Sequence, residues 1–471
     1  MRQSNNHAFE EGLNPMPPRP LRDGVRDAAG APESAPKAPV EPSAPAPEPA
    51  APVSSTANDL DYSNFFWGSG KDPFDILNPF DDWFDEARPA GYYLFGQPMS
   101  GAPRPRVDVV EQLRHEQLHG LINLASYNYL GLSYRPEVIE ASCEATRRFG
   151  TGASGSPILS GTTELHEELQ RKLAQFKNKE QCLLFPSGYS ANLGVIAGLM
   201  RSGDLVVTDQ FAHASIVDGI ILSKAQVRYF RHNNAADLDR KLKDFPGRKL
   251  VIVEGVYSMD GDLANLPEIV EVAQRNGARI MIDEAHSAFL FGKNGRGVAE
   301  HFGLDDQIDI HLGTFSKSLG GQGGYVVGSR KLIRYLKGFA RAHVFSCALA
   351  PGVVGGLIKA CEIARDEPEL RARLWENTAL LQEHLRSRGV DIGDSKSQVI
   401  PIMIRDDDRI FKVAEDMIHS GVYINPVRYP AVGKHRSRLR ISVTASHTRE
   451  ELREAADIIA RVLGRHGFLC P

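Results

Sequence analysis

Apolar and polar residues follow one another along the middle of the chain in a regular order. Short apolar runs at 182–185, 205–207, 250–253 and 279–282 are separated by stretches of helical periodicity, such as 166–176 (HEELQRKLAQF). Strand-length runs that alternate with helices are typical of a mostly parallel sheet covered by helices on both faces. The sequence therefore predicts an α/β fold for this region.

Beyond about residue 350 the pattern changes to helix, strand, helix. This order favours a smaller α+β domain packed beside the first. We therefore expect a large domain at 123–350 and a small C-terminal domain at 351–471.

Residues 1–56 differ in composition from the rest of the chain. The stretch 31–52 alternates Pro with Ala, Ser and Glu. Repeated proline removes backbone donors, and few side chains there could build a core. We expect a disordered, partly polyproline-II tail, which is either dispensable or a tether to a partner protein.

The following segment, 57–122, begins with an acidic stretch that is dense in aromatic residues. Seven Phe and Trp residues lie between positions 59 and 93. That much aromatic surface is not left in water, so it packs on the body of the protein or docks on a partner. Packing on the body is the simpler expectation.

Charge and composition exclude several classes of protein. The 55 basic and 59 acidic residues give a net charge of −4, which argues against an electrostatic nucleic-acid binder. No apolar run approaches the ~20 residues of a membrane helix, and the first residues lack a signal-peptide core. The five cysteines never form a CxxC pair, which favours a reducing compartment with neither a disulfide framework nor a zinc site. We expect a cytoplasmic enzyme.

Polar residues follow two of the expected strands directly. Asp283 and His286 come after the run at 279–282, and Lys317 lies in GTFSKSLGG after a run at 308–312. Parallel sheets bind ligands beyond the carboxyl ends of their strands. A lysine and an aspartate placed there suit pyridoxal phosphate (PLP): the lysine forms a Schiff base with the aldehyde, and the aspartate keeps the pyridine nitrogen protonated.

Each of these signals is weak alone. The DEAH sequence at 283–286 also occurs in nucleotide-hydrolysing helicases, but the phosphate loop that accompanies it there is missing from this sequence. A lone lysine at a strand end is more commonly a solvated surface residue.

Two further motifs strengthen the prediction. The stretch 187–192 (SGYSAN) follows an expected strand and opens a helix, whose positive end suits a phosphate. His213 follows another strand and could bring an imidazole over a flat ring, although alone it would be an ordinary histidine at a helix start. Four such motifs in this order together indicate a PLP enzyme.

From about residue 123 to 463 the chain resembles the α-oxoamine synthases, fold-type I PLP enzymes that condense an amino acid with an acyl thioester. The matching stretches are 123–131 (NLASYNYLG), 150–152, 254–262 (EGVYSMDGD), 283–287, 295–297, 313–318 and 438–440. Within the family, YNYLG, the RHNN at 231–234 and VYSMDGD are most similar to the bacterial serine palmitoyltransferase branch. Relatives that use glycine or alanine more often have NDYLG.

The resemblance implies a role for each matching residue and makes 123–350 the PLP-binding domain. Lys317, His213 and Asp283 would be catalytic, and Arg440 and Asn128 would bind the substrate. For Arg440, which would hold the substrate carboxylate, the alternative is a surface ion pair. The cofactor-binding residues would be Ser187, Gly188, Tyr189, His213, Ser258, Asp283, His286, Thr314, Ser316, Lys317 and Ser346. Ser346 would reach the phosphate from the neighbouring subunit of a homodimer with a shared active site.

The activity implied is the decarboxylative condensation of L-serine with a long-chain acyl-CoA, giving an α-amino ketone such as 3-ketosphinganine for sphingolipid biosynthesis. Pro157 and Ser160 stand where bacterial palmitoyltransferases have an arginine and later an asparagine. The alternative is therefore an α-oxoamine synthase that uses a carrier-protein-bound chain, or glycine or alanine, in natural-product biosynthesis. A sphingoid product would also be compatible with peripheral membrane contact.

Other classes fit less well. An aminotransferase or lyase of the same fold would share Asp283 and Lys317, but it would not predict the GTGASG or SMDGD stretches. A non-catalytic partner subunit would lack Lys317.

Overall fold

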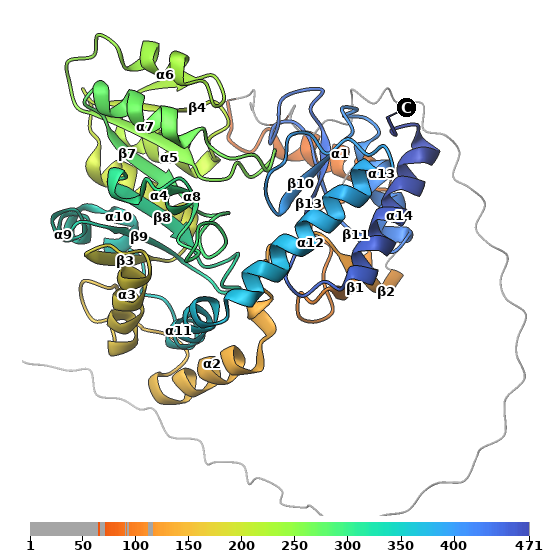
Figure 1. Cartoon of the computed structure of the whole chain (residues 1–471), viewed down its shortest axis with the longest axis horizontal. Coiled ribbons are helices and arrows are strands. Elements are labelled where there is room, and N and C mark those ends of the chain that lie inside the picture. Colours follow the sequence, from red (N-terminus) through yellow and green to blue (C-terminus); the bar gives the residue numbers. More distant parts are fainter. Residues whose placement is uncertain (1–64, 66–70, 90, 92–93, 112–115, 471) are drawn as a thin grey trace, which may run out of the picture. The chain divides into compact units, whose positions relative to one another are not determined.

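The computed structural model describes residues 65, 71–89, 91, 94–111 and 116–470 (Figure 1). The Pro-rich tail predicted at 1–56 lies outside these residues. None of the helices that the structure describes is long and apolar enough to cross a membrane.

A seven-stranded sheet forms the centre of the large domain, in the order β3-β9-β8-β7-β6-β4-β5. Strand β9 pairs antiparallel with β3 and β8, and the other four pairs are parallel. This topology confirms the predicted mostly parallel α/β sheet. The strands are β3 (Gln181–Phe185), β4 (Leu205–Asp209), β5 (Gln226–Phe230), β6 (Lys249–Glu254), β7 (Arg279–Asp283), β8 (Ile310–Thr314) and β9 (Gly324–Gly328).

Helices bury both faces of this sheet except at edge strand β5, which is why most of its strands are apolar runs in sequence. In β6, Leu250 and Ile252 pack on one face while Val251 and Val253 pack on the other. The first face is covered by α4 (Gly188–Leu199), α5 (Ala214–Ser223) and α9 (Arg330–Phe339). The second is covered by α3 (Glu164–Phe176), α6 (Ala235–Leu242), α7 (Leu266–Arg275) and α11 (Pro351–Asp366), and α2 (Pro136–Phe149) packs on α11.

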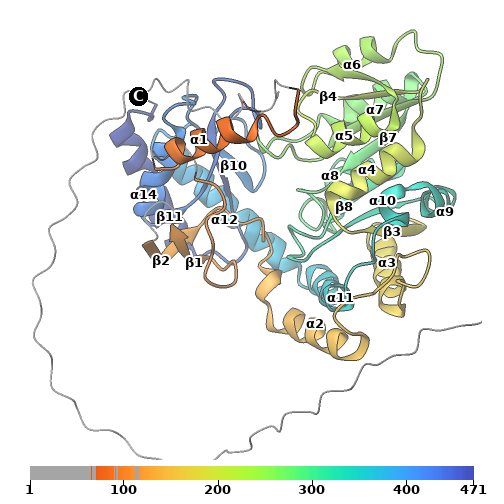
Figure 2. The same ribbon diagram turned by 180° about the vertical axis from the view of Figure 1, so that it is seen from behind.

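Two three-stranded sheets accompany the C-terminal helices. One has the order β10-β13-β12, and the other, β1-β2-β11, pairs the segment before residue 123 with the C-terminal part of the chain. The strands are β10 (Val399–Met403), β12 (Asn425–Val427), β13 (Arg438–Ser442), β1 (Arg106–Glu111), β2 (Glu116–Asn123) and β11 (Val422–Tyr423). The helices are α12 (Pro368–Arg386), α13 (Ile410–His419) and α14 (Arg449–His466), seen from behind in Figure 2.

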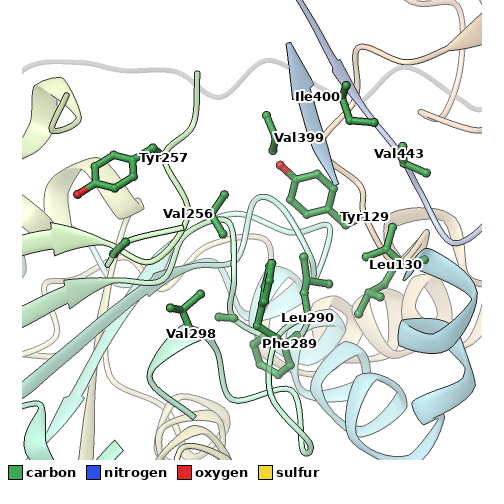
Figure 3. Close-up of a cluster of buried hydrophobic side chains, with 14 of the residues drawn as sticks. Tyr129, Leu130, Val256, Tyr257, Phe289, Leu290, Val298, Val399, Ile400 and Val443 are labelled. Carbon is green, nitrogen blue, oxygen red and sulfur yellow. The ribbon is translucent and has the colours of Figure 1, made fainter. Parts of the chain in front are cut away.

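The regions predicted as the large domain (123–350) and the small domain (351–471) share one hydrophobic core. Figure 3 shows Tyr129 and Phe289 packed near Val399 of β10 and Val443, which follows β13. All four side chains are buried. Beside this shared core, the loops at the carboxyl ends of β6, β7 and β8 face the small domain.

The aromatic segment forms a helix, α1 (Leu77–Ala87). Trp83 is buried, and its ring packs beside those of Phe65, Phe80 and Phe84. Among the described residues, the hydrophobic cluster around Trp83 consists of side chains from this segment alone. Phe74 and Leu77 stay exposed.

Candidate active site

A cavity of about 380 Å³ lies at the carboxyl ends of the parallel strands, against the small domain. Its walls contain five of the residues predicted for the site. Four come from the large domain and one from β13, and they are His213, Ser258, His286, Lys317 and Arg440. Residues 423–428 line the small-domain side, and Tyr127 lines the cavity as well.

Lys317 lies in the loop after β8 and points into this cavity as one of its lining residues. Burial lowers the pKa of its amine, while the nearby carboxylates of Asp283 and Glu254 oppose that shift. A lowered pKa leaves more of the amine neutral near pH 7, as a nucleophile or proton acceptor must be.

Asp283 ends β7 and is buried, with both carboxylate oxygens oriented by donors. Asn192 donates from Nδ2 to Oδ2 at 2.8 Å, and the backbone N–H of Ala285 donates to Oδ1 at 2.9 Å. Asn192 lies within the SGYSAN motif, but sequence reasoning gave it no role. Asn192 lies one turn into α4, at the carboxyl ends of the strands. A polar residue at this position is the sequence signal that could have identified it.

Glu254 is a second buried carboxyl that sequence reasoning left out. It ends β6 next to Asp283, and its Oε1 accepts the backbone N–H of His213 at 2.7 Å. Burial, together with the charge of Asp283, raises the pKa of Glu254 to about 8. The strand-end rule that selected Asp283 applies equally to Glu254.

The two histidines of the cavity are held by different partners. His213 is the N-cap of α5, and its Nδ1 accepts the backbone N–H of Ser215 at 3.2 Å, so its neutral ring has the proton on Nε2. Burial lowers the pKa of His213. Nδ1 of His286 lies 2.7 Å from the hydroxyl of Tyr129, and burial holds the pKa of His286 well below its usual value.

The start of α4 forms a polar cradle beside the loop after β8. Ser187 caps the helix by accepting the backbone N–H of Ser190 at 3.0 Å. A Cβ on Gly188 would lie 2.9 Å from Cβ of Thr314, so only glycine allows this approach. Thr314 Oγ1 is 2.9 Å from Ser316 Oγ. Free N–H groups at a helix start beside two hydroxyls suit a phosphate.

Arg440 of β13 provides a buried positive charge to the cavity. Its Nε has no hydrogen-bond partner among the described residues, and its Nη1 makes only a long bond of 3.4 Å to the carbonyl oxygen of Ser258. The guanidinium lies over the ring of Tyr127, 4.5 Å from its centroid. Burial lowers the pKa of Arg440 to about 10. A buried cation that lacks a counterion suits a substrate carboxylate.

Eight predicted residues are not among those that line the cavity. Asp283 and the four residues of the phosphate cradle (Ser187, Gly188, Thr314 and Ser316) are described above, and the other three have different surroundings. Asn128 is buried and bonds with Ser133, to whose hydroxyl it donates at 2.9 Å. Its neighbour Tyr127 faces the cavity instead. Tyr189 is exposed, with its hydroxyl on Asp218. Ser346 is half-buried beyond α10 (Arg341–Val344).

Comparison with known proteins assigns the family. The family model for class I and II aminotransferases matches residues 119–459. The chain belongs to this family. The match includes every site residue described above.

Within it, the chain is an α-oxoamine synthase. It is 40% identical over 375 residues to the 8-amino-7-oxononanoate synthase of Symbiobacterium thermophilum, covering 78% of this chain and 96% of that one. It is 39% identical over 380 residues to the serine palmitoyltransferase of Sphingobacterium spiritivorum, covering 80% and 94%. The solved serine palmitoyltransferase of Sphingomonas wittichii superposes with a TM-score of 0.80 at 33% identity, over 84% of this chain and all of that one.

These comparisons confirm the predicted fold, enzyme class and cofactor. This α-oxoamine synthase is a PLP-dependent acyltransferase, and a similar solved structure, at 34% identity, contains PLP. The cavity fits that cofactor because it combines a lysine of lowered pKa, an oriented aspartate, a phosphate cradle and an arginine without an acidic partner among the described residues. The amino acid and the acyl donor remain open at this level, since relatives of two activities are equally similar.

Proposed function

We propose that the chain condenses an amino acid, L-serine first, with a long-chain acyl-CoA, releasing free CoA and carbon dioxide and giving an α-amino ketone such as 3-ketosphinganine. The observation that supports it best is the guanidinium of Arg440, which has no acidic partner among the described residues and lines the same cavity as Lys317. These two groups would hold the carboxylate and the amino end of one amino acid.

Bound PLP supplies an aldehyde that captures the amino group and a ring that accepts electrons. Lys317 and Asp283, which follow or end adjacent strands, would contact the cofactor. Asp283, oriented by Asn192, would keep a proton on the ring nitrogen. Ser187, Gly188, Tyr189, Thr314 and Ser316 would hold the phosphate, and His213, Ser258 and His286 would surround the ring.

Proton transfer at the substrate Cα would belong to Lys317. Its lowered pKa favours the neutral amine, which would accept the Cα proton and later return it. Arg440 would fix the direction of the Cα–H bond by binding the carboxylate. The same grip would hold the carboxylate that is lost as carbon dioxide after the acyl group has been joined.

Three sequence motifs favour serine: YNYLG, RHNN and VYSMDGD. Ser258 and Met259 of the last motif line the cavity, as does Tyr127 of the first. His232 of RHNN instead bonds to Asp209 and Asp262 and supports the loop that contains Ser258. VYSMDGD and YNYLG therefore support the choice of substrate more directly than RHNN.

The alternative is glycine or alanine as the amino acid, or an acyl chain bound to a carrier protein. It is favoured by the departure at Pro157 and Ser160 and by a 37% identical relative, the PigH 4-hydroxy-2,2'-bipyrrole-5-methanol synthase of Serratia sp., of which the chain covers 60%.

A homodimer with a shared active site is part of the proposal. Ser346, which the family resemblance assigns to the neighbouring subunit's phosphate, is not among the residues lining the cavity of its own chain. A sphingoid-base product would also place the enzyme in sphingolipid biosynthesis, with peripheral membrane contact as an option.

The test is a visible absorption spectrum of the purified holoenzyme, titrated in turn with L-serine, glycine and L-alanine. A shift of the PLP band with serine alone supports the proposal, and a shift with glycine or alanine alone supports the alternative. Product formation from acyl-CoA and from acyl-carrier protein, measured side by side, then identifies the donor. Absence of condensation with every pair would contradict both.

A further inference from the structure

Helix α9 presents an exposed basic face that the proposed reaction does not use. Arg330, Lys331, Arg334 and Lys337 are exposed on it, and Arg341 follows. No Asp or Glu occurs between positions 309 and 362. None of these five cations forms an ion pair within the part of the chain that the structure describes. By contrast, Arg248 and Arg279 on the neighbouring surface are paired with Asp204 and Asp309.

Aromatic rings are exposed among these cations. Lys331, Tyr335 and Phe339 are four residues apart, so they follow one ridge of the helix. The rings of Tyr335 and Phe339 stack with centroids 4.4 Å apart. Beyond them Phe345 is 72% exposed, under the guanidinium of Arg341. Exposed aromatic residues with arginine are the composition of an interface rather than of ordinary surface.

Helix α1 presents a face of the opposite charge. It has four exposed acidic side chains (Asp81, Asp82, Asp85 and Glu86) and no basic residue. None of the four forms an ion pair with another described residue. Phe74, Leu77 and Phe80 are exposed along the same segment. This is the apolar and charged complement of the α9 face.

The two faces of one chain do not meet. In both Figure 1 and Figure 2, α1 lies beside β10, and α9 lies beside α10 and β3 on the other side of the large sheet. An α-helix rises 1.5 Å per residue, so the 11 residues of α1 span only about 16 Å. Within one chain α1 does not extend to α9, so a contact between these two faces would join two molecules.

We propose that α1 of one subunit docks on the basic aromatic face of α9 in a second copy of this chain, and the reverse. This inference rests on the proposed homodimer and names a contact that holds it together. Ser346 follows α9 and α10 in sequence, and Leu94, Phe95 and Gly96, which line the cavity, follow α1. A partner whose Ser346 reaches this cavity brings its α9 towards this α1. Each contact then occurs twice, as two-fold symmetry requires.

The direct test places a photo-crosslinking phenylalanine analogue at position 80 of the full-length holoenzyme. Copies labelled with ¹⁵N are mixed with unlabelled copies, dissociated and reassociated, and the adducts are mapped by mass spectrometry. We expect adducts to peptides of 330–345 that join a labelled and an unlabelled chain. The matched control is the same analogue at Phe302, since Phe80 and Phe302 are both 37% exposed.

Charge reversal tests the electrostatic part of the contact. Asp82→Lys with Asp85→Lys, or Lys331→Glu with Arg334→Glu, each place like charges together and should lower the adduct yield by roughly tenfold. Combining both pairs restores opposite charges and should restore the yield. Arg453→Glu with Arg461→Glu, two exposed cations on α14, is the control and should leave the yield unchanged.

The particle mass, measured by light scattering during chromatography, separates the possible failures. A dimer whose position-80 adducts lie within one chain, or on a surface other than α9, overturns the docking proposal and leaves the proposed function intact. A mass of one chain at every concentration overturns the homodimer, and the docking proposal with it. Failure of the charge combination to restore the yield also contradicts the contact.

Discussion

Two clusters of ionisable groups adjoin the 254–262 loop, and the protein shifts the pKa values of their basic groups in opposite directions. In the supporting cluster, His232 is hydrogen-bonded to both Asp209 and Asp262, at 3.1 and 2.7 Å. Burial opposes its charge, but the two carboxylates together outweigh burial and raise the pKa of His232 to about 10. In the reactive cluster, burial prevails, and the pKa values of His213 and Lys317 are lowered.

The difference shows how one fold stabilises some charges and leaves others unstable. A charge with two counterions at hydrogen-bond distance is stabilised, and it holds a loop in place. A lysine or an arginine without such partners stays available for a ligand, at a cost in stability. We expect substitutions in the reactive cluster to remove activity and those in the supporting cluster to remove stability.

The largest effect is expected from Lys317→Ala. Condensation should fall by at least about 10³-fold, because the group that binds the cofactor and moves the Cα proton is lost. The thermal midpoint should be unchanged or higher, because an incompletely paired buried amine is removed. Turnover and calorimetry are compared on the same preparation. Retained condensation would contradict the assignment of Lys317.

Arg440→Met should raise KM for the amino acid by about 10²-fold, since a buried carboxylate would lose a charged partner worth roughly 3 kcal/mol. KM for the acyl donor should stay within about twofold. Steady-state kinetics with each substrate varied in turn provides the measurement. An equal loss for both substrates would mean that Arg440 supports the fold rather than the carboxylate.

His232→Gln should cost about 3–5 kcal/mol of unfolding free energy, because Asp209 and Asp262 would lose the cation between them. Urea unfolding measures this, with exposed His301→Gln as the control. The wild-type contribution is fully present below the unfolded pKa of about 6.5 and is lost as pH rises through 10. The difference in unfolding free energy between wild type and variant should therefore become smaller from neutral to alkaline pH.

Glu254→Gln should have the smallest effect, a change in the slope of the unfolding free energy against pH. The folded pKa of Glu254, about 8, lies above its ordinary value of 4.5, so the folded protein holds a proton that the unfolded chain releases between these values. Stability contributed by this group falls as pH rises across that window. The glutamine variant should lose stability less steeply between pH 5 and 8, and an identical slope would contradict the raised pKa.

Most of the large domain was predictable because its strands are buried on both faces. The runs at 182–185, 205–207, 250–253 and 279–282 each lie within an observed strand. Strand β5 was missed because it lies at the sheet edge, where Gln226 and Tyr229 are exposed. Strand β9 was missed because glycines at both of its ends resemble a loop.

The sequence predicted those site residues that directly follow a single expected strand. Lys317, Asp283 and His213 followed from that rule, whereas Asn192 and Glu254 act through hydrogen bonds that join separate segments. Asn128 is hydrogen-bonded to Ser133, whereas its neighbour Tyr127 lines the cavity. No pattern in the sequence shows which of the two faces the site. Pairings of this kind depend on distances between segments, which the order of residues does not record.

The antiparallel strand β9 also affects how the chain emerges from the ribosome. Edge strand β3 pairs only with β9, and its Gln181 is opposite Gly328. At translation rates of 5–20 residues per second, β3 waits on the order of ten seconds before its partner is synthesised. An apolar strand without a partner is a template for aggregation during that interval. Slower translation before residue 328 should therefore lower the yield of folded protein more than the same delay after it.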